Sequence, residues 1–149
     1  YYHEGIGETM GAFIERMDRE RIAIGEKMGL ELGRNIFSMY MQYETEYNTT
    51  GDSLSEVFKK VDAYDSIYAS ADIRTRYIYE DVPTGLIPFV ELGRLVGCDV
   101  DSMNLVVDMC CKVLNEDFWN MEESRTLAKL GLEGMTADQI YEYARTGKK

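Results

Sequence analysis

The chain has 149 residues and a mass of 17.1 kDa, which suits one domain with a single core and is too little for two full domains. Hydrophobic residues make up 45% and charged residues 29%, with only 2 prolines, so the composition excludes disordered and collagen-like chains. The 16 basic and 27 acidic residues give a net charge of -11, which disfavours nucleic acid and anionic membranes as partners. No apolar run approaches the roughly 18 residues of a membrane span, and we expect a cytoplasmic protein.

Cysteine and histidine are scarce in this sequence. The spacing of Cys98, Cys110 and Cys111 fits neither a disulfide framework nor a zinc site, so we expect reduced thiols in the core and no metal. Because His3 is the only histidine, a triad or metal site that needs a further histidine cannot form within this chain. The first residue is Tyr rather than Met, and we expect that an upstream segment is missing.

The apolar residues recur every three or four positions, which predicts a chain made of helices. In chain order the predicted helices cover residues 8–28, 32–47, 54–68, 84–96, 102–114 and 119–130, with a short seventh that ends near 146. Their boundaries are marked by capping boxes of Ser53 with Glu56 and of Thr136 with Gln139, by Asp101 as a cap, and by Gly29 and Gly97 as stops. The fold class is therefore all-α, a single bundle of six to seven helices.

Helical spacing also predicts which side chains are buried. In the helix over 102–114, the residues expected to face the core are Val106, Cys110, Val113 and Leu114. Asp18 and Glu20 lie in a charged turn of the first helix, and we expect either of them to pair with an arginine across the bundle.

Residues 74–83 interrupt the helical pattern. Periodicity fails between 70 and 84, and Pro83 disfavours a helical conformation at Val82, so we predict an irregular or short helical connector here. Such connectors often carry functional residues.

The usual signatures of catalytic sites are missing from the sequence. It has no phosphate-binding loop and no Gly-x-Ser-x-Gly turn. Gly5, Gly7 and Gly11 resemble a dinucleotide-binding fingerprint only superficially, because no strand precedes them. Acidic pairs such as Glu122 with Glu123 are expected by chance in a chain with 27 acidic residues.

The connector over 74–83 has the richest chemistry in the chain. Arg74, Arg76, Glu80 and Asp81 share this aromatic-rich stretch. Arginine suits the bidentate capture of a substrate carboxylate, and a carboxylate can orient a histidine or accept a hydrogen bond from an amine. The alternative is an ion-pair cluster that ties the connector to the bundle. The residue types alone leave both interpretations open.

Four stretches carry a likeness to a known family: residues 2–5, 17–24, 76–88 and 93–97. The most specific is the Arg-Tyr-x-x-Glu-Asp-Val-Pro-x-Gly-Leu run that begins at Arg76. Together they resemble the C-terminal helical domain of the octopine/nopaline dehydrogenase family. The resemblance implies a fold like the C-terminal domain of 6-phosphogluconate dehydrogenase, with residues 1–149 as a substrate-binding and dimerisation domain.

The resemblance also implies an activity, that of an NAD(P)-dependent opine dehydrogenase. Such an enzyme condenses an amino acid with a 2-keto acid reductively, or runs the reverse reaction. NAD or NADP would be bound mainly by an N-terminal Rossmann domain that is not present in this chain, so the fragment alone is expected to be inactive. The whole enzyme would be a homodimer. Two alternatives stay open: a non-catalytic helical oligomerisation module, and a free-standing binder of small molecules.

The family pattern assigns roles to two residues. It puts Arg76 on a substrate carboxylate and Asp81 beside the catalytic histidine as its partner. That histidine belongs to a segment upstream of this chain, so His3 is not expected to take its place. Family members can place a tryptophan near the end of the first helix, whereas Trp119 is the only tryptophan here. The identity of the amino-acid substrate therefore stays open.

Overall fold

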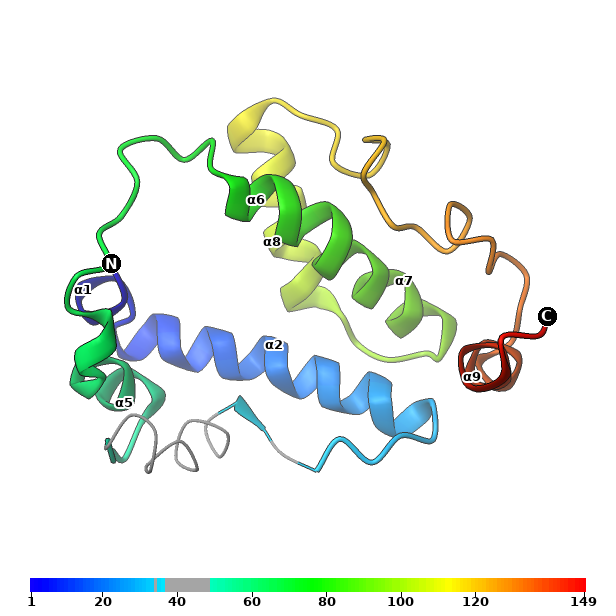
Figure 1. Ribbon diagram of the computed structural model, residues 1–149, viewed down its shortest axis with the longest axis horizontal. Helices are drawn as coiled ribbons and strands as arrows, with labels where there is room; N and C mark the ends of the chain where they lie inside the picture. Colours follow the sequence, from blue (N-terminus) through cyan, green and yellow to red (C-terminus); the bar gives the residue numbers. More distant parts are fainter. Residues whose placement is uncertain (34, 37–48) are drawn as a thin grey trace. The chain divides into compact units, whose positions relative to one another are not determined.

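A computed structural model describes residues 1–33, 35–36 and 49–149 (Figure 1). Every regular element in these ranges is helical, and none of their residues lies in a strand, which confirms the predicted all-α class. The helix predicted over 32–47 falls mostly outside the described residues. No described helix is both long enough and apolar enough to cross a bilayer.

The chain divides into two compact units. Unit 1 comprises Tyr1–Arg19 and Leu32–Ala71, and unit 2 comprises Glu20–Glu31 and Asp72–Lys149. Helix α2 (Glu8–Lys27) runs from one unit into the other and ends before Gly29, whose φ of +76° is the left-handed conformation expected of a stop.

Unit 1 packs the short helices α1 (Tyr2–Gly5) and α5 (Leu54–Lys60) against each other, and the 3-10 turn η1 (Asp62–Tyr64) follows. The Ser53 side chain accepts a hydrogen bond from the Glu56 N–H at 3.2 Å, so the predicted start of α5 is confirmed. The predicted end at residue 68 is wrong, because Val61 leaves the helical region with ψ of 100°. Val61 is completely buried at the point where the helix ends.

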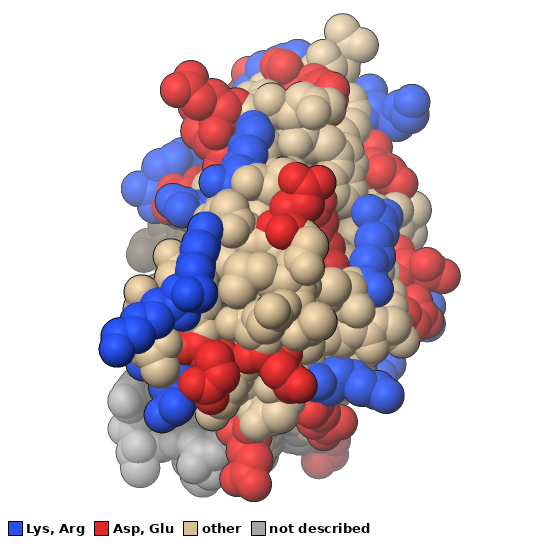
Figure 2. All heavy atoms as spheres, turned by 90° about the vertical axis from the view of Figure 1, so that its right-hand side faces the viewer, with Lys and Arg blue, Asp and Glu red and all other residues tan. Residues whose placement is uncertain are grey.

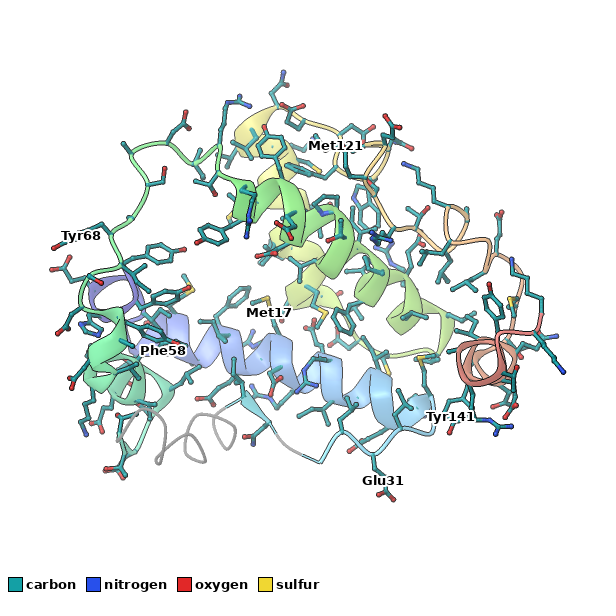
Figure 3. All side chains as sticks on the ribbon, in the orientation of Figure 1. Met17, Glu31, Phe58, Tyr68, Met121 and Tyr141 are labelled. Carbon is teal, nitrogen blue, oxygen red and sulfur yellow. The ribbon has the colours of Figure 1, made fainter. Side chains whose placement is uncertain are left out.

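Aromatic rings from three elements form much of the packing in unit 1. The Tyr2 ring lies 5.8 Å from that of Phe58 and 4.5 Å from that of Tyr64, measured between centroids. Phe58, labelled on α5 in Figure 3, is only 4% exposed. Contacts between aromatic rings thus fix the first turn of the chain against α5.

Unit 2 contains a nearly continuous helical path from residue 76 to 95. It consists of α6 (Arg76–Asp81), a π-helical turn η2 (Val82–Leu86) and α7 (Ile87–Leu95), and it packs against α8 (Asp101–Leu114). The core between them is formed by Val82, Ile87, Val107, Cys110, Leu114 and Phe118. Gly97, with φ of +69°, confirms the predicted stop after α7.

The prediction that Val82 leaves the helical region was wrong. Val82 has φ of -69° and ψ of -57°, and its N–H donates to the Ile78 carbonyl as in an α-helix. Pro83 has no N–H to donate, and the chain widens here into a π turn in which the Ile87 N–H reaches back to the Val82 carbonyl. The Thr84 hydroxyl donates to the Glu80 carbonyl at 2.7 Å. The widened turn therefore lets the helix pass through a proline.

Helix α8 begins with a partner that the sequence did not reveal. The Glu20 carboxylate accepts hydrogen bonds from the N–H groups of Ser102 and Met103 at 2.8 and 2.9 Å. Asp101 is the first helical residue, and its N–H donates to the Asp99 carboxylate, so it is not the cap that we predicted. Glu20 is also not paired with an arginine among the described residues. Glu20 is only 8% exposed, and its carboxylate instead satisfies N–H groups that have no partner within the first turn of the helix.

The buried face of α8 differs in part from the prediction. Cys110 and Leu114 are buried as expected, and Val106 packs against the core, but Val113 is 61% exposed. Val113 points about 100° away from the buried Leu114, outside the part of the surface that is covered at this end of the helix. Fully buried Val107 takes the inward position.

The helix predicted over 119–130 does not form. Residues 115–135 make a series of turns, and Met121 of this segment, labelled in Figure 3, packs against the core of unit 2. Side chains take up backbone groups that a helix would use: the Ser124 hydroxyl donates to the Phe118 carbonyl, and the Asp117 carboxylate accepts from the Asn120 N–H. The final helix α9 (Ala137–Thr146) is confirmed, together with its capping box.

Candidate functional site

Arg74 is fully engaged in holding the start of α6 against the end of α8. Its guanidinium donates to the Tyr79 hydroxyl at 2.9 Å, to the Glu116 carboxylate at 3.3 Å and to the Leu114 carbonyl at 3.0 Å. The hydrogen bond to Tyr79, with a further contribution from Glu116, raises the pKa of Arg74 above its ordinary value. At Arg74, therefore, the connector over 74–83 forms an ion-pair and hydrogen-bond cluster that ties it to the rest of the fold.

Arg76, two residues later, has a different environment. It is the first residue of α6, its side chain is 82% exposed, and its Nε lies 3.1 Å from the Glu80 carboxylate one helical turn on. Its guanidinium also lies 6.0 Å from the centre of the Tyr77 ring. The terminal nitrogens of Arg76 donate no hydrogen bond within the described ranges, so they are available to a ligand.

Asp81 closes α6 and is exposed. Its carboxylate makes no hydrogen bond or ion pair with any residue that the structure describes. Five helical steps of about 100° place Arg76 and Asp81 roughly 140° apart around the axis. The structure thus puts both residues on one short helix but on different faces, so they do not form a pair.

The π turn after α6 is a feature that sequence reasoning missed. It contains Pro83 and Gly85, and a Cβ added at Gly85 would meet no atom within 4 Å. The Pro83 carbonyl accepts the Arg125 N–H at 2.9 Å, which ties the turn to the segment over 115–135. The signal was present as a proline inside an otherwise helical pattern, and π turns occur frequently at functional sites.

His3 is engaged within unit 1. Its Nδ1 lies 3.2 Å from the Asp65 carboxylate, and its Nε2 lies 3.0 Å from the Val61 carbonyl. Both ring nitrogens therefore contact groups that hold α1 beside α5 and η1. This contact is structural.

The cysteines are all free, as predicted, but only Cys110 is buried, whereas Cys98 and Cys111 are half-buried. Burial, followed by the neighbouring Cys111, raises the pKa of the Cys110 thiol. Within the described ranges, no group of three His, Cys, Asp or Glu side chains is placed to hold a metal ion.

Trp119 and the acidic end of α8 border an open hollow of about 500 Å³. Its lining residues are Asp108, Cys111, Lys112, Asn115, Glu116, Asp117 and Trp119. The three carboxylates already accept hydrogen bonds from other side chains of unit 2. The Trp119 ring contacts the Arg94 guanidinium at 5.4 Å, so its role here is packing. On the face shown in Figure 2, acidic and basic side chains are interspersed.

The fold defines the class to which this chain belongs. It superimposes on a solved complex of octopine dehydrogenase with NADH and L-arginine with a TM-score of 0.78, at 17% identity, covering 100% of this chain and 41% of that chain. A second structure, octopine dehydrogenase with NADH and agmatine, gives 0.76 at 18% identity, covering 99% of this chain and 41% of that one. The chain has the fold of a helical domain found in dehydrogenases of this kind.

Sequence comparison places the chain more closely. Residues 1–114 match the family described as NAD/NADP octopine/nopaline dehydrogenase, alpha-helical domain. The opine dehydrogenase of Arthrobacter sp. (strain 1C) is 38% identical over 140 residues, which cover 94% of this chain and 37% of that protein. Protein ocs of Agrobacterium tumefaciens (strain Ach5) is 30% identical over 127 residues, covering 85% and 34%. The chain belongs to the octopine/nopaline dehydrogenase family, and it spans a little over a third of the length of these curated relatives.

Proposed function

We propose that residues 1–149 form the substrate-binding and dimerisation domain of an NAD(P)-dependent opine dehydrogenase. The observation that carries this proposal is the family match over 1–114 together with a 38% identical opine dehydrogenase. In the proposed reaction, an amino acid, a 2-keto acid, NAD(P)H and a proton give an N-substituted amino acid, NAD(P)⁺ and water. The amine forms an imine with the keto carbon, and hydride transfer to that carbon completes the product.

The cofactor is assigned to a Rossmann domain outside these 149 residues. The described residues contain no strand, so they offer no β-α-β unit on which a dinucleotide could lie. When it is bound, the nicotinamide supplies the hydride. The solved relatives named above are NADH complexes, which supports a nicotinamide cofactor in the whole enzyme.

Arg76 is proposed to bind the carboxylate of a substrate. Its exposed guanidinium has terminal nitrogens without a partner among the described residues, and two parallel N–H groups match the geometry of a carboxylate. Arg74 could not take this role without giving up three hydrogen bonds. The neighbouring arginines are thus assigned to separate tasks.

Asp81 is proposed to accept a hydrogen bond from the catalytic histidine, which lies outside this chain. Its carboxylate is exposed and has no partner among the residues that the structure describes, which supports that role, since a structural carboxylate would contact the fold. Asp81 would hold the imidazole in one tautomer and stabilise its protonated form. The separation of Arg76 and Asp81 around α6 fits two residues that contact different partners.

We further propose that the whole enzyme is a cytoplasmic homodimer. Exposed apolar residues on α8, namely Leu105, Met109 and Val113, support association because such surface is costly in water. Light scattering of the whole protein tests this directly. A monomer at high concentration would contradict it.

The reaction is tested with the protein that contains this chain and its cofactor domain. We expect oxidation of NADH or NADPH only when an amino acid and a 2-keto acid are both present. We also expect a product whose mass equals their sum minus water plus two hydrogens. Asp81→Asn should lower kcat with little change in KM, because it keeps the shape of the side chain and loses its charge. Absence of turnover with every substrate pair would instead favour a non-catalytic helical module.

A further inference from the structure

Arg76 contacts two other side chains of its own helix. The Glu80 carboxylate lies 3.1 Å from its Nε, and the Tyr77 ring lies 6.0 Å from the centre of the guanidinium. Both neighbours come from α6 itself, and Glu80 lies four residues after Arg76, a spacing at which helical side chains meet. The contact is made at Nε, the guanidinium nitrogen nearest the aliphatic part of the side chain, and the two terminal nitrogens donate no hydrogen bond to a described residue.

Glu80 is in turn fixed by the unusual turn that follows it. Its backbone carbonyl accepts the hydroxyl of Thr84 at 2.7 Å, in the stretch where Pro83 prevents a regular helical bond. This contact secures the last turn of α6 where the helix widens. The backbone of Glu80 is therefore secured at the start of the π turn.

We propose that Glu80 is a positioning residue that orients Arg76 for the substrate carboxylate. The inference rests on the proposed function, because it needs Arg76 to bind that carboxylate. A free arginine has many rotamers, and a ligand that must order it loses affinity. An arginine already held at Nε by Glu80 presents Nη1 and Nη2 as a fixed fork, with two donors for the two oxygens of a carboxylate.

Glu80 also has a second effect, which acts against binding of the substrate carboxylate, and the sign of the net effect can be measured. Its negative charge repels an incoming carboxylate. If this repulsion were the larger effect, Glu80 would weaken binding. Both side chains are exposed, at 82% and 55%, so water and salt weaken both effects, and they weaken the repulsion more because it acts over a longer distance than the 3.1 Å contact. Orientation should therefore outweigh repulsion, and removal of the Glu80 charge should weaken binding.

The test is the kinetics of Glu80→Gln in the whole enzyme. We expect KM for the carboxylate substrate to rise about two- to threefold, because an exposed ion pair within one helix restricts its arginine only weakly. The values of kcat and of KM for the cofactor should stay unchanged, and Glu80→Asp should recover part of the loss because it keeps the charge. Glu142→Gln is the matched control, since Glu142 forms an exposed ion pair with Arg145 on α9.

Combination with Arg76→Ala separates this inference from the proposed function. In that background Glu80→Gln should have no further effect on KM, because a positioning residue acts only through its target. A lower KM in Glu80→Gln, or an equal effect with and without Arg76, would overturn the role of Glu80 while the proposed function stands. An unchanged KM in Arg76→Ala, or an enzyme without any turnover, would overturn both.

Discussion

Residues 76–95 and residues 115–135 of unit 2 contrast in sequence and in structure. The first stretch contains both prolines of the chain and is helical throughout, whereas the second has no proline and consists of turns. In the first, the helix widens into a π turn at Pro83, which has no N–H to donate. In the second, side chains such as Ser124 and Asp117 bond to the backbone within the segment. The partners available to each backbone group decide the outcome, and intrinsic propensity is the weaker influence.

The largest expected effect tests how tightly the helical stretch is packed. A Cβ at Gly93 on α7 would lie 2.2 Å from Val100 Cγ1 and 3.1 Å from Ile24 Cδ1. Gly93→Ala should therefore lower the free energy of unfolding by about 1–3 kcal/mol, despite the better helix propensity of alanine.

The matched control is Gly85→Ala in the π turn, where a Cβ meets no atom within 4 Å. This change should be neutral or slightly stabilising. Denaturant unfolding of both variants gives the difference. Equal stability of Gly93→Ala and the parent would mean that α7 is helical without the close packing described above.

A smaller effect is expected in the stretch of turns. The buried Ser124 hydroxyl donates to the Phe118 carbonyl, and Ser124→Ala leaves that carbonyl without this donor. The free energy of unfolding should fall by about 1–2 kcal/mol.

Thr126→Ala is the corresponding change at a more exposed bond, where the threonine oxygen accepts the Lys129 N–H at 3.2 Å. It should cost roughly 0.5 kcal/mol or less. Thermal melts of Ser124→Ala and Thr126→Ala show which variant loses more stability. A loss at Thr126 as large as that at Ser124 would argue against burial as the cause.

The smallest effect concerns Cys110, where burial raises the pKa of the thiol. The folded state then holds its proton to higher pH than the unfolded state, so this group favours folding less as pH rises above the ordinary thiol pKa. In alkylation at mildly alkaline pH, Cys110 should react more slowly than the half-buried Cys98 and Cys111. Mass spectrometry of the modified peptides checks the order, and Cys110 reacting first would contradict it.

Local signals in the sequence predicted several of the helix ends. Gly29, Gly97 and the pair Thr136 with Gln139 act through backbone groups within a few residues, so their effects are visible in sequence. Glu20 caps α8 from 82 residues away, and no local pattern could reveal it. The helical path through Pro83 depends in the same way on contacts made in the folded chain, including the hydrogen bond from Arg125.

The candidate site was predictable only in part. The residue types in 74–83 indicated carboxylate chemistry, and the family resemblance singled out Arg76 and Asp81. Periodicity failed in this stretch, so their placement on different faces of α6 could not be derived beforehand. The sequence also could not show that Arg74 forms hydrogen bonds within the fold while the terminal nitrogens of Arg76 form none with a described residue. That difference became visible only with the contacts of Arg74 to Tyr79 and Glu116.

The most direct measurement compares Arg76→Ala with Arg74→Ala in the whole enzyme, by steady-state kinetics and thermal melting. Arg76→Ala should raise KM for the carboxylate substrate about 10- to 150-fold, the equivalent of 1.5–3 kcal/mol for a charge-assisted hydrogen bond, with an unchanged Tm. Arg74→Ala should lower the Tm and leave KM for the folded enzyme nearly unchanged, because its bonds hold α6 to α8. A wild-type KM in Arg76→Ala, or a Tm lowered as much as in Arg74→Ala, would contradict the division of roles between the two arginines.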